Sequence, residues 1–398
     1  MLDTSIVRRN SALRFVLVIG VVSFFADFTY EGARSITGPF LAMLGANGAI
    51  VGVVAGVGEL LGYGLRMVSG TVSEKTQKFW TITLCGYAIQ MIAVPLLAFA
   101  KRWQIAAVLI ILERVGKATR NPPRDVMLSH AAKEIGYGWG FGIHEALDQF
   151  GALFGPLIVA AVLAHRGNYA PAFAVLVAPA IITYGMLLIS HHLYPHPEGM
   201  EDHPAPGSSS NSLPRTFWIY LCGAALVAAG FADFQLIAFH LAKTNSVGAI
   251  WIPIAYSIAM AISGAGSLLF GRLFDRFGLS ILVPLTIISA AFAPLVFLGS
   301  FWTILTGAAL WGLGMGVHES IIPAAVATMV PAQRRSSAYG IFTGVYGVAW
   351  FLGSAALGFL YDISARTAIV FCLVLQGSAL PFFMKAKAAH APLQEAGG

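Results

Sequence analysis

Apolar stretches of about twenty residues recur along the whole of this 398-residue chain. An α-helix rises 1.5 Å per residue, so about twenty residues cross a hydrocarbon core roughly 30 Å thick. Twelve stretches of this kind fit into the sequence, with short loops between them. The pattern predicts an all-α integral membrane protein with twelve transmembrane helices.

The overall composition agrees with this prediction. Hydrophobic residues make up 57% of the chain and charged residues 11%, whereas soluble domains carry roughly a quarter charged residues. The formal charge of +6 does not indicate nucleic acid, because the basic residues are not clustered on a phosphate-binding face. The cysteines Cys85, Cys222 and Cys372 fall in separate apolar stretches, so we interpret them as packing residues.

The predicted spans form two groups of six around a polar linker. They cover residues 12–44, 49–68, 80–100, 104–120, 140–163 and 172–189, then 218–241, 250–270, 281–298, 302–322, 339–360 and 368–384. The Pro/Ser-rich stretch between the groups has the composition of a flexible linker. We therefore expect an N-terminal bundle in residues 1–190, a cytoplasmic linker in 191–214 and a C-terminal bundle in 215–398.

Basic residues are distributed unevenly over the predicted loops. With both termini in the cytoplasm, the cytoplasmic segments and adjoining helix ends hold seventeen Lys and Arg residues, and the opposite side holds five: Lys101, Arg102, Arg166, Lys243 and Arg366. This bias follows the positive-inside rule and predicts a multi-pass protein with both termini cytoplasmic. The compact loops lead us to expect a prokaryotic inner membrane, with the protein a monomer in the lipid bilayer.

Several short motifs recur in order at a nearly constant spacing. The tetrapeptide FADF occurs at residues 25–28 and again 206 residues later, at 231–234. The GTVSEKT stretch from Gly70 is followed 201 residues later by GRLFDRF. Further pairs at similar spacing are Pro123 with Pro323 and Gly155 with Gly353. These matches predict two six-helix halves of the same topology, related by an axis along the membrane normal.

The segment GRLFDRFG resembles the loop signature G-x-x-x-D-R/K-x-G between helices two and three of the major facilitator superfamily. The first half departs from it, with Glu74 as its acid and Gln77 in place of the second glycine. The resemblance covers essentially the whole chain and implies a solute transporter with two six-helix bundles. It also implies gating residues that latch the cytoplasmic ends of the halves, namely Glu74, Lys75, Asp275 and Arg276. The alternative is that these residues merely form a positive-inside loop.

The predicted fifth helix contains GALFGP at residues 151–156, which resembles the G-x-x-x-G-P signature of exporters in the superfamily. This resemblance favours export. Small residues four apart also let helices approach closely, which gives Gly151 and Gly155 a structural role that is independent of direction.

The first predicted span carries Asp27, Glu31 and Arg34 at positions i, i+4 and i+7, on one face of the helix. An ionisable group inside a membrane is costly and usually faces a cavity or a partner, so this face marks a candidate transport pathway. An ion pair between Arg34 and one of the acids would instead serve only helix packing. With two acids to one base, one carboxylate would remain for a proton or a cation.

Glu59 falls close to the middle of the second predicted span, with no basic residue in its own helical turn. A carboxyl group that is buried without a partner holds its proton more tightly. Glu59 would then be protonated at rest and would exchange its proton during transport. The alternative is pairing with Arg34 or Arg114 of a neighbouring helix.

The fifth predicted span places His144, Glu145 and Asp148 within an arc of about 100°. A histidine and two acids so close together could relay protons, or they could ligate a divalent cation. The other half offers a second His-acid pair in His318 and Glu319. Two further ionisable residues of its first span are Asp233 and His240.

Within the predicted spans, carboxylates outnumber the bases that lie away from span ends. The acids are Asp27, Glu31, Glu59, Glu113, Glu145, Asp148, Asp233 and Glu319, and the bases are Arg34 and Arg114. Such an excess would favour protons and cationic or zwitterionic solutes. Arg114 resembles the fourth-helix arginine that the superfamily uses for proton coupling or substrate contact. Next to Pro122 and Pro123 the same helix carries Lys117, Arg120 and Arg124, which we interpret as a helix end that meets headgroups or cytoplasm.

No nucleotide-binding signature of the G-x-x-x-x-G-K-S/T kind occurs in the sequence, so ATP is not the expected energy source. We expect a secondary active transporter without a cofactor, in which two halves open a central cavity alternately to each side. Protons would be the coupling ion and a small organic solute the substrate. The competing hypothesis is a divalent metal cation transporter built on the carboxylates and His144, while a membrane enzyme, a channel or a receptor fits the residues less well.

Overall fold

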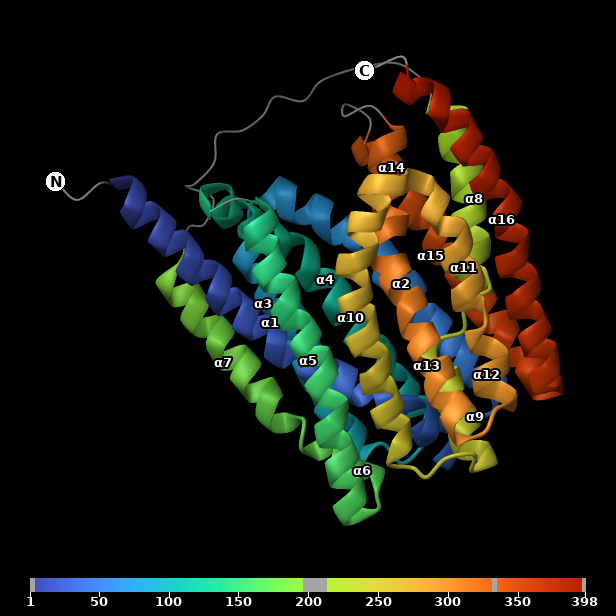
Figure 1. Cartoon of the computed structure of the whole chain (residues 1–398). Helices are drawn as coiled ribbons and strands as arrows, with labels where there is room; N and C mark the ends of the chain where they lie inside the picture. The colour runs from blue at the N-terminus through green and yellow to red at the C-terminus, as the bar shows by residue number, and fades with distance from the viewer. Residues whose placement is uncertain (1–3, 136, 196–212, 331–334, 396–398) are drawn as a thin grey trace. The chain divides into compact units, whose positions relative to one another are not determined.

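The computed structural model describes residues 4–135, 137–195, 213–330 and 335–395. Every regular element in these residues is a helix (Figure 1). Ten helical segments of the described chain are long and apolar enough to cross a membrane. The structure therefore confirms the all-α, multi-pass membrane fold that the apolar stretches predict.

The helices follow one another along the chain in two groups. The first group is α1 (Thr4–Met43), α2 (Gly48–Thr76), α3 (Phe79–Leu96), the 3₁₀ helix η1 (Leu97–Phe99), α4 (Trp103–Ile135), α5 (Tyr137–Arg166), α6 (Tyr169–Ala174) and α7 (Val177–Leu193). The second group is α8 (Arg215–Ala229), α9 (Phe234–Thr244), α10 (Trp251–Phe277), the 3₁₀ helix η3 (Gly278–Ile281), α11 (Leu282–Ala290), α12 (Phe292–Leu298), α13 (Phe301–Gly316), the π-helix η4 (Val317–Ile321), α14 (Ile322–Met329), α15 (Arg335–Ile363) and α16 (Ala365–Glu395).

Each predicted span coincides with one helix or with a short run of helices. Five spans are broken: the third into α3 and η1, the sixth into α6 and α7, the seventh into α8 and α9, the ninth into η3, α11 and α12, and the tenth into α13, η4 and α14. Two predicted spans are absent from the ten apolar segments. One is α4, which is rich in charged residues, and the other is α13, which ends early at the π-helix.

Helix α4 is longer than its predicted span of residues 104–120, because it continues through Pro122 and Pro123 to Ile135. Proline cannot donate the backbone hydrogen bond to the carbonyl four residues before it. The carbonyl that Pro123 leaves without this bond belongs to Thr119, and Ser69 of α2 donates its hydroxyl to that oxygen at 2.5 Å. A side chain of a neighbouring helix thus allows α4 to continue, and it carries Arg120 and Arg124 in its interior rather than at its end.

The second copy of FADF lies at a break between helices. Helix α8 ends at Ala229, and α9 begins at Phe234 directly after Asp233. Side chains satisfy backbone carbonyl oxygens at the break. Trp311 Nε1 donates to the carbonyl oxygen of Ala232 at 2.8 Å, and Gln376 Nε2 donates to that of Gly230 at 3.1 Å. The first copy, by contrast, lies inside the continuous helix α1.

The chain divides into two compact units. The first comprises Met1–Thr37, Leu61–Ala205 and Ala249–Ser257, and the second comprises Gly38–Leu60, Pro206–Gly248 and Ile258–Gly398. The second unit thus includes the end of α1 and the beginning of α2. These units are defined by contacts between residues, whereas the halves 1–190 and 215–398 were inferred from the sequence repeat. The division into these two halves therefore stays a prediction. Most of the predicted linker, residues 196–212, lies outside the described residues.

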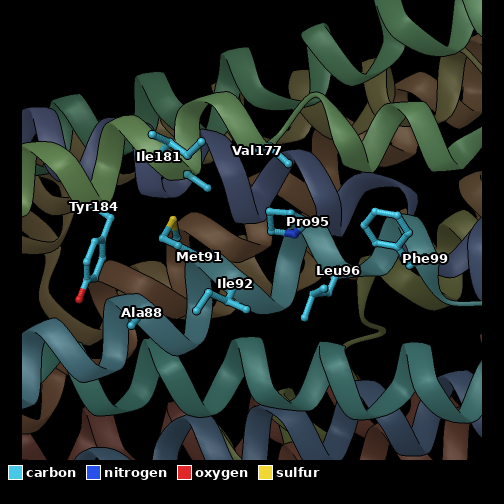
Figure 2. A pocket seen from close by; sticks show the side chains of 10 residues that line it. Ala88, Met91, Ile92, Pro95, Leu96, Phe99, Val177, Ile181 and Tyr184 are labelled. Atoms are coloured by element: carbon cyan, nitrogen blue, oxygen red, sulfur yellow. The ribbon is translucent and has the colours of Figure 1, made fainter.

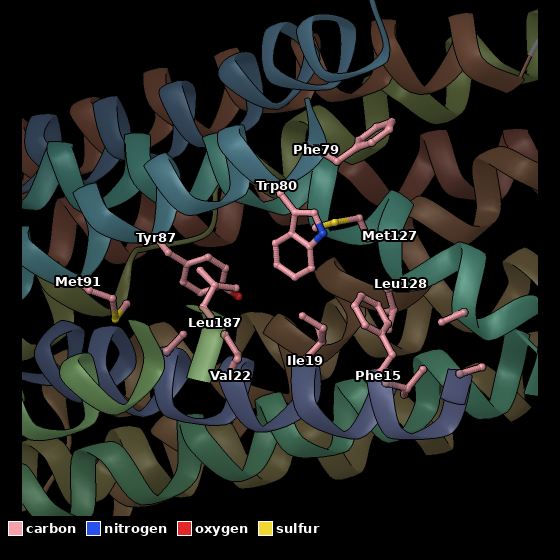
Figure 3. Close-up of a cluster of buried hydrophobic side chains, with 14 of the residues drawn as sticks. Phe15, Ile19, Val22, Phe79, Trp80, Tyr87, Met91, Met127, Leu128 and Leu187 are labelled. Carbon is pink, nitrogen blue, oxygen red and sulfur yellow. The ribbon is translucent and has the colours of Figure 1, made fainter. Parts of the chain in front are cut away.

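The first unit has a hydrophobic core between four helices (Figure 3). Phe15 and Ile19 of α1 lie against Trp80 of α3, with Met127 of α4 and Leu187 of α7 completing the cluster. Phe15 and Trp80 meet edge to face, with ring centroids 6.4 Å apart. Lipid tails are as apolar as these side chains, so close packing rather than water exclusion stabilises such a core in a bilayer.

Glycines let the fifth helix of each predicted half touch the first. A β-carbon at Gly151 or Gly155 of α5 would collide with the carbonyl oxygens of Phe24 and Phe28 in α1. In the second unit, a β-carbon at Gly353 of α15 would collide with the carbonyl oxygen of Ala229 in α8. The GALFGP glycines therefore have the packing role that their spacing predicts.

Candidate functional site

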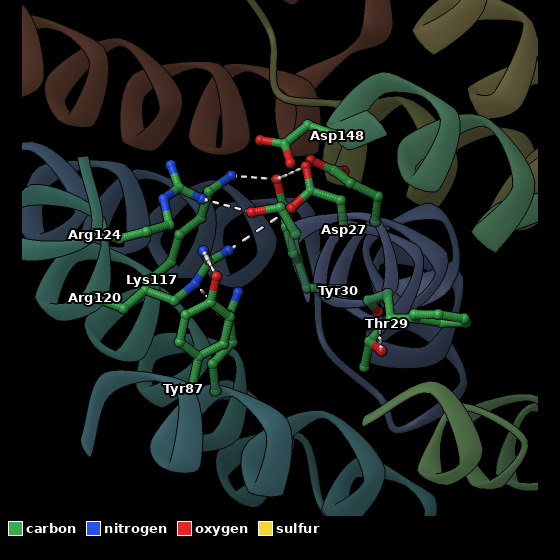
Figure 4. A network of polar contacts seen from close by, with 12 residues as sticks. Asp27, Thr29, Tyr30, Tyr87, Lys117, Arg120, Arg124 and Asp148 are labelled. Atoms are coloured by element: carbon green, nitrogen blue, oxygen red, sulfur yellow. Dashed lines mark hydrogen bonds and ion pairs between the residues drawn. The ribbon is translucent and has the colours of Figure 1, made fainter. Parts of the chain in front are cut away.

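A buried charge cluster lies inside the first unit, where α1 faces α4 and α5 (Figure 4). At its centre, Arg120 Nη2 of α4 is 3.7 Å from Asp27 Oδ1 of α1. The Arg120 side chain is only 1% exposed, and Asp27 is also buried. An unpaired charge at this depth would be very costly, so each of the two groups depends on the other.

Polar partners from α3 hold the Arg120 guanidinium in place. Its Nε donates to Gln90 Oε1 at 2.6 Å, and its Nη1 donates to the Tyr87 hydroxyl at 2.9 Å. The guanidinium also lies over the Tyr87 ring, 4.3 Å from its centroid. The amide nitrogen of Gln90 in turn donates to Glu113 Oε1 at 2.8 Å. Arg120 is therefore held by side chains of α3 in addition to its contact with Asp27.

Each of the two acids of α1 accepts a hydrogen bond from a tyrosine hydroxyl. The Tyr30 hydroxyl donates to Asp27 Oδ2 at 3.3 Å, and Lys117 Nζ donates to the Tyr30 oxygen. The Tyr256 hydroxyl, from the part of α10 that belongs to the first unit, donates to Glu31 Oε2. Both Asp27 and Glu31 are thus hydrogen-bonded to a buried tyrosine.

A second branch of the cluster connects α4 to α5. Arg124 Nη1 donates to the Ser23 hydroxyl at 3.1 Å, and the same hydroxyl lies 2.8 Å from His144 Nε2. The other ring nitrogen of His144 is 3.6 Å from Asp148 Oδ2. Asp27, Asp148, Arg120 and Arg124 belong to one network of polar contacts (Figure 4).

Two more ion pairs join neighbouring residues of the predicted site. Arg34 Nη1 is 3.8 Å from Glu31 Oε1, and Arg114 Nε is 3.4 Å from Glu113 Oε2. All four side chains are buried. The pairing of Glu31 with Arg34 matches the alternative in which this ion pair contributes to helix packing.

The expected carboxylate excess is wrong for this cluster. That expectation counted Arg34 and Arg114 as the internal bases and treated the lower basic residues of α4 as a helix end. Arg120 and Arg124 are in fact buried, and Lys117 reaches Tyr30 within the same network. The physical reason for Arg124 is the continuation of α4 past its prolines. Arg120 and Lys117 precede the prolines, and their side chains meet polar partners on α3 and α1.

Several other predicted residues are exposed or only half-buried. Glu145 is exposed on α5 and accepts a hydrogen bond from Gln149 Nε2 at 2.9 Å, whereas His144 is buried. Glu59 is half-buried on the part of α2 that belongs to the second unit. The predicted gating residues Glu74, Lys75 and Arg276 are exposed, and the side chain of Asp275 lies outside the described part of the chain.

The second unit holds a smaller polar centre around the α8–α9 break. Asp233 accepts hydrogen bonds from Trp350 Nε1 at 3.1 Å and from the Ser354 hydroxyl. His318 lies on the π-helix η4, with Nδ1 2.6 Å from the Tyr346 hydroxyl. π-Helical turns and broken membrane helices occur frequently at functional sites. Asp233 and His318 are therefore candidate site residues in this unit.

The remaining ionisable residues of the second unit are separate from this centre. His240 is buried, and its Nδ1 lies 3.0 Å from the Tyr361 hydroxyl. Glu319 is exposed, so it does not share the environment of its neighbour His318. Of the predicted His-acid pair, His318 is thus buried and Glu319 is exposed.

Among the residues that the structure describes, no group of three His, Cys, Asp or Glu side chains could hold a metal ion. His144 contacts one serine and one carboxylate, and Glu145 is on the outside. The residues on which the divalent cation hypothesis rests therefore do not converge.

The neutral members of the network were not predicted from the sequence. Ser23, Tyr30, Tyr87, Gln90 and Tyr256 are polar residues inside apolar spans, where each requires a hydrogen-bond partner. Tyr30 could have been found, because it lies one helical turn from Asp27 on α1. The contributions of α3 and α10 depend on how the helices pack and have no signature in the sequence.

A sequence profile described as Major Facilitator Superfamily matches residues 19–354 and 238–396 of the chain. The chain belongs to the major facilitator superfamily. This superfamily member is 43% identical over 376 residues to an uncharacterised protein of Mycobacterium tuberculosis, with 93% of this chain and 92% of that protein covered. It is 25% identical over 370 residues to an uncharacterised MFS-type transporter of Methanocaldococcus jannaschii, and this match covers 90% of this chain and 92% of that protein.

Two further similarities are more limited. A tetracycline resistance protein, class H, of Pasteurella multocida is 26% identical over 125 residues, which cover 30% of this chain and 31% of that protein. The crystal structure of a bacterial homologue of the human lysosomal transporter Spinster, inward-facing and unoccupied, matches with a TM-score of 0.72. It covers 96% of this chain and 98% of that structure at 14% sequence identity, so it shows the shared fold alone.

Proposed function

We propose that this superfamily transporter moves a small organic solute by alternating access and couples the movement to protons. The observation that supports the proposal is the buried network in which Arg120 pairs with Asp27, and Ser23 and His144 link Arg124 to Asp148. Buried acid–base groups of this kind mark proton and substrate pathways in membrane proteins. A proton taken up by Asp27 or Asp148 would change the net charge of this network.

Protonation would act by releasing a cation from its carboxylate. When Asp27 takes up a proton, its attraction for Arg120 falls, while Gln90 and Tyr87 still hold that guanidinium. A negative group of a solute could then pair with the freed charge, or the helices could rearrange around it. Glu31 would act in the same way through Arg34 and Tyr256. Glu59, inside α2, is the further candidate for proton exchange.

The direction that we propose is export. The GALFGP segment resembles the exporter signature of the superfamily. We further propose an inner membrane location, cytoplasmic termini and a monomer. Glu74, Lys75, Asp275 and Arg276 would latch the cytoplasmic ends of the two halves, as the loop signature implies. The exposure of Glu74, Lys75 and Arg276 leaves them accessible for such contacts.

A thermal-shift screen against metabolites, drugs and metals at several pH values would identify a solute that stabilises the purified protein. That solute would then be tested for entrance counterflow in proteoliposomes. A carrier that works by alternating access exchanges labelled for unlabelled solute and saturates. Flux that neither saturates nor shows counterflow would indicate a channel and would contradict the proposal.

A further inference from the structure

An apolar groove lies between α3 and α7 in the first unit (Figure 2). It has a volume of about 460 Å³. Met91, Ile92 and Pro95 form one wall, and Val177 and Ile181 form the other. Apart from Tyr184 at one end, every lining residue is apolar. Such a surface offers almost no polar group to a hydrophilic solute, and it is separate from the buried charge cluster.

The dimensions of the groove match one leaflet of a bilayer. Its lining on the α3 side runs from Ala88 to Phe99, which at 1.5 Å per residue is a length of about 16 Å. Half of a hydrocarbon core roughly 30 Å thick is about 15 Å. Phe99 and Ile181 are 77% and 67% exposed, so the groove is open along its side. An extended acyl chain that enters from the surrounding lipid can therefore lie in it.

Positive charge is concentrated where the groove ends. Phe99 closes η1, and the exposed Lys101 and Arg102 follow directly. Helix α6 contacts η1, and the exposed residues His165 and Arg166 lie just before α6. Three of the five basic residues assigned to the outer side are thus gathered here, and the sequence has no acid in residues 96–107 or 164–177.

We propose that this groove binds an anionic phospholipid of the outer leaflet. One acyl chain would lie between α3 and α7, and the phosphate would lie among Lys101, Arg102 and Arg166. Basic residues at a membrane surface attract anionic headgroups. Here they act beside a preformed apolar groove, so the lipid is retained at one place instead of exchanging freely around the protein. This binding does not depend on the identity of the transported solute.

Native mass spectrometry of the full-length protein, delipidated in detergent, would test the proposal with phosphatidylglycerol and phosphatidylcholine of identical chains. We expect phosphatidylglycerol to be retained preferentially and to raise the Tm more. Lys101→Gln together with Arg102→Gln should lower its binding roughly tenfold or more. The matched control is Lys243→Gln with Arg366→Gln, which removes the same charge from the outer side of the second unit and should leave binding unchanged.

A second pair of variants tests the groove itself. Ala88→Phe fills the groove from its α3 wall and should lower retention of both lipids, whereas Val374→Phe, at an exposed site on α16 in the second unit, should not. Equal retention of the two lipids by the wild-type protein would overturn the proposal. The same holds for a preference for phosphatidylglycerol that survives both Lys101→Gln/Arg102→Gln and Ala88→Phe.

Discussion

Arg120 is the residue on which the buried cluster depends. Its side chain is buried, forms an ion pair with Asp27 and donates hydrogen bonds to Gln90 and Tyr87. The guanidinium also lies over the face of the Tyr87 ring. Arginine suits this position because its planar fork can donate several hydrogen bonds while it also stacks on an aromatic ring. The pair is a poor source of net stability, since both groups were desolvated to form it. Its presence is better explained by a role in function.

Removal of one member of the pair should be costly. Arg120→Gln or Asp27→Asn alone is expected to lower the free energy of unfolding by about 3 kcal/mol, because each leaves a charge buried without its partner. The double variant should lose less than the sum of the two. Thermal unfolding of all four proteins in one detergent measures this coupling. Additive losses would mean that the two groups do not interact, and Glu145→Gln, at an exposed carboxylate, serves as the neutral control.

At the same scale, the acids of the cluster were easier to predict from the sequence than its bases. Asp27 and Glu31 stand out because a carboxylate inside an apolar span has few structural explanations. Arg120 and Arg124 were misassigned, since they precede or follow two prolines that ordinarily mark the end of a helix. The compensating hydroxyl of Ser69 comes from a distant part of the chain, and no local pattern reveals it.

Helix α4 shows at the level of the element how a neighbouring side chain supports a proline-containing helix. Ser69→Ala should remove the donor to the Thr119 carbonyl and lower stability by about 1–2 kcal/mol, because a buried acceptor is left without its bond. Pro123→Ala restores a backbone N–H that can bond to the same oxygen. Ser69→Ala should therefore cost clearly less in the Pro123→Ala background. An equal loss of Tm in both backgrounds would contradict this explanation.

The contact between α5 and α1 offers a second test at this scale. Gly155→Ala should lower the free energy of unfolding by about 1–3 kcal/mol, since its β-carbon would collide with the Phe28 carbonyl. Gly185→Ala on α7 is the matched control, because a β-carbon there would have no atom within 4 Å apart from its chain neighbours and the adjacent backbone of its own helix. Alanine has the higher helix propensity, so this control should be neutral or slightly stabilising. A comparable loss of Tm in both variants would show that the collision with Phe28 does not set the effect.

Element boundaries were predictable only where the apolar pattern is uninterrupted. Helices α2, α5, α15 and α16 each contain one whole predicted span without a break, and α1 contains its predicted span except for Leu44. The break between α8 and α9 has no turn sequence stronger than a single glycine, Gly230, and its carbonyls are satisfied by Trp311 and Gln376. The π-helix at His318 likewise reflects packing, so neither interruption could be derived from hydropathy.

At the scale of the whole molecule, the second unit contains segments from both halves of the sequence, which matters for alternating access. Its segment Gly38–Leu60 comes from the first half of the sequence, and there Asp362 of α15 accepts hydrogen bonds from the backbone N–H groups of Gly48 and Ala49, both at 2.8 Å. A carboxylate at a helix N-terminus satisfies otherwise free N–H groups and interacts favourably with the helix dipole. If the predicted halves move relative to each other in the proposed alternating access, this connection between α2 and α15 would open in each cycle.

A reversible cross-link at this connection should therefore stop transport. In a background without Cys85, Cys222 and Cys372, the pair Ala49→Cys and Asp362→Cys is expected to form a disulfide under oxidation and to abolish solute counterflow. Reductant should restore the flux, and neither single variant should respond to oxidation. Undiminished counterflow in the quantitatively cross-linked protein would show that α2 and α15 stay together throughout the cycle.

Proton flux measures most directly whether the buried carboxylates couple solute movement to protons. Proteoliposomes that contain a pH dye would be given a solute identified by the thermal-shift screen. Wild-type protein and Glu145→Gln should show solute-dependent pH change inside the vesicles, and Asp27→Asn or Glu59→Gln should abolish it. Solute-driven proton flux that is unchanged in both Asp27→Asn and Glu59→Gln would contradict coupling through these carboxylates.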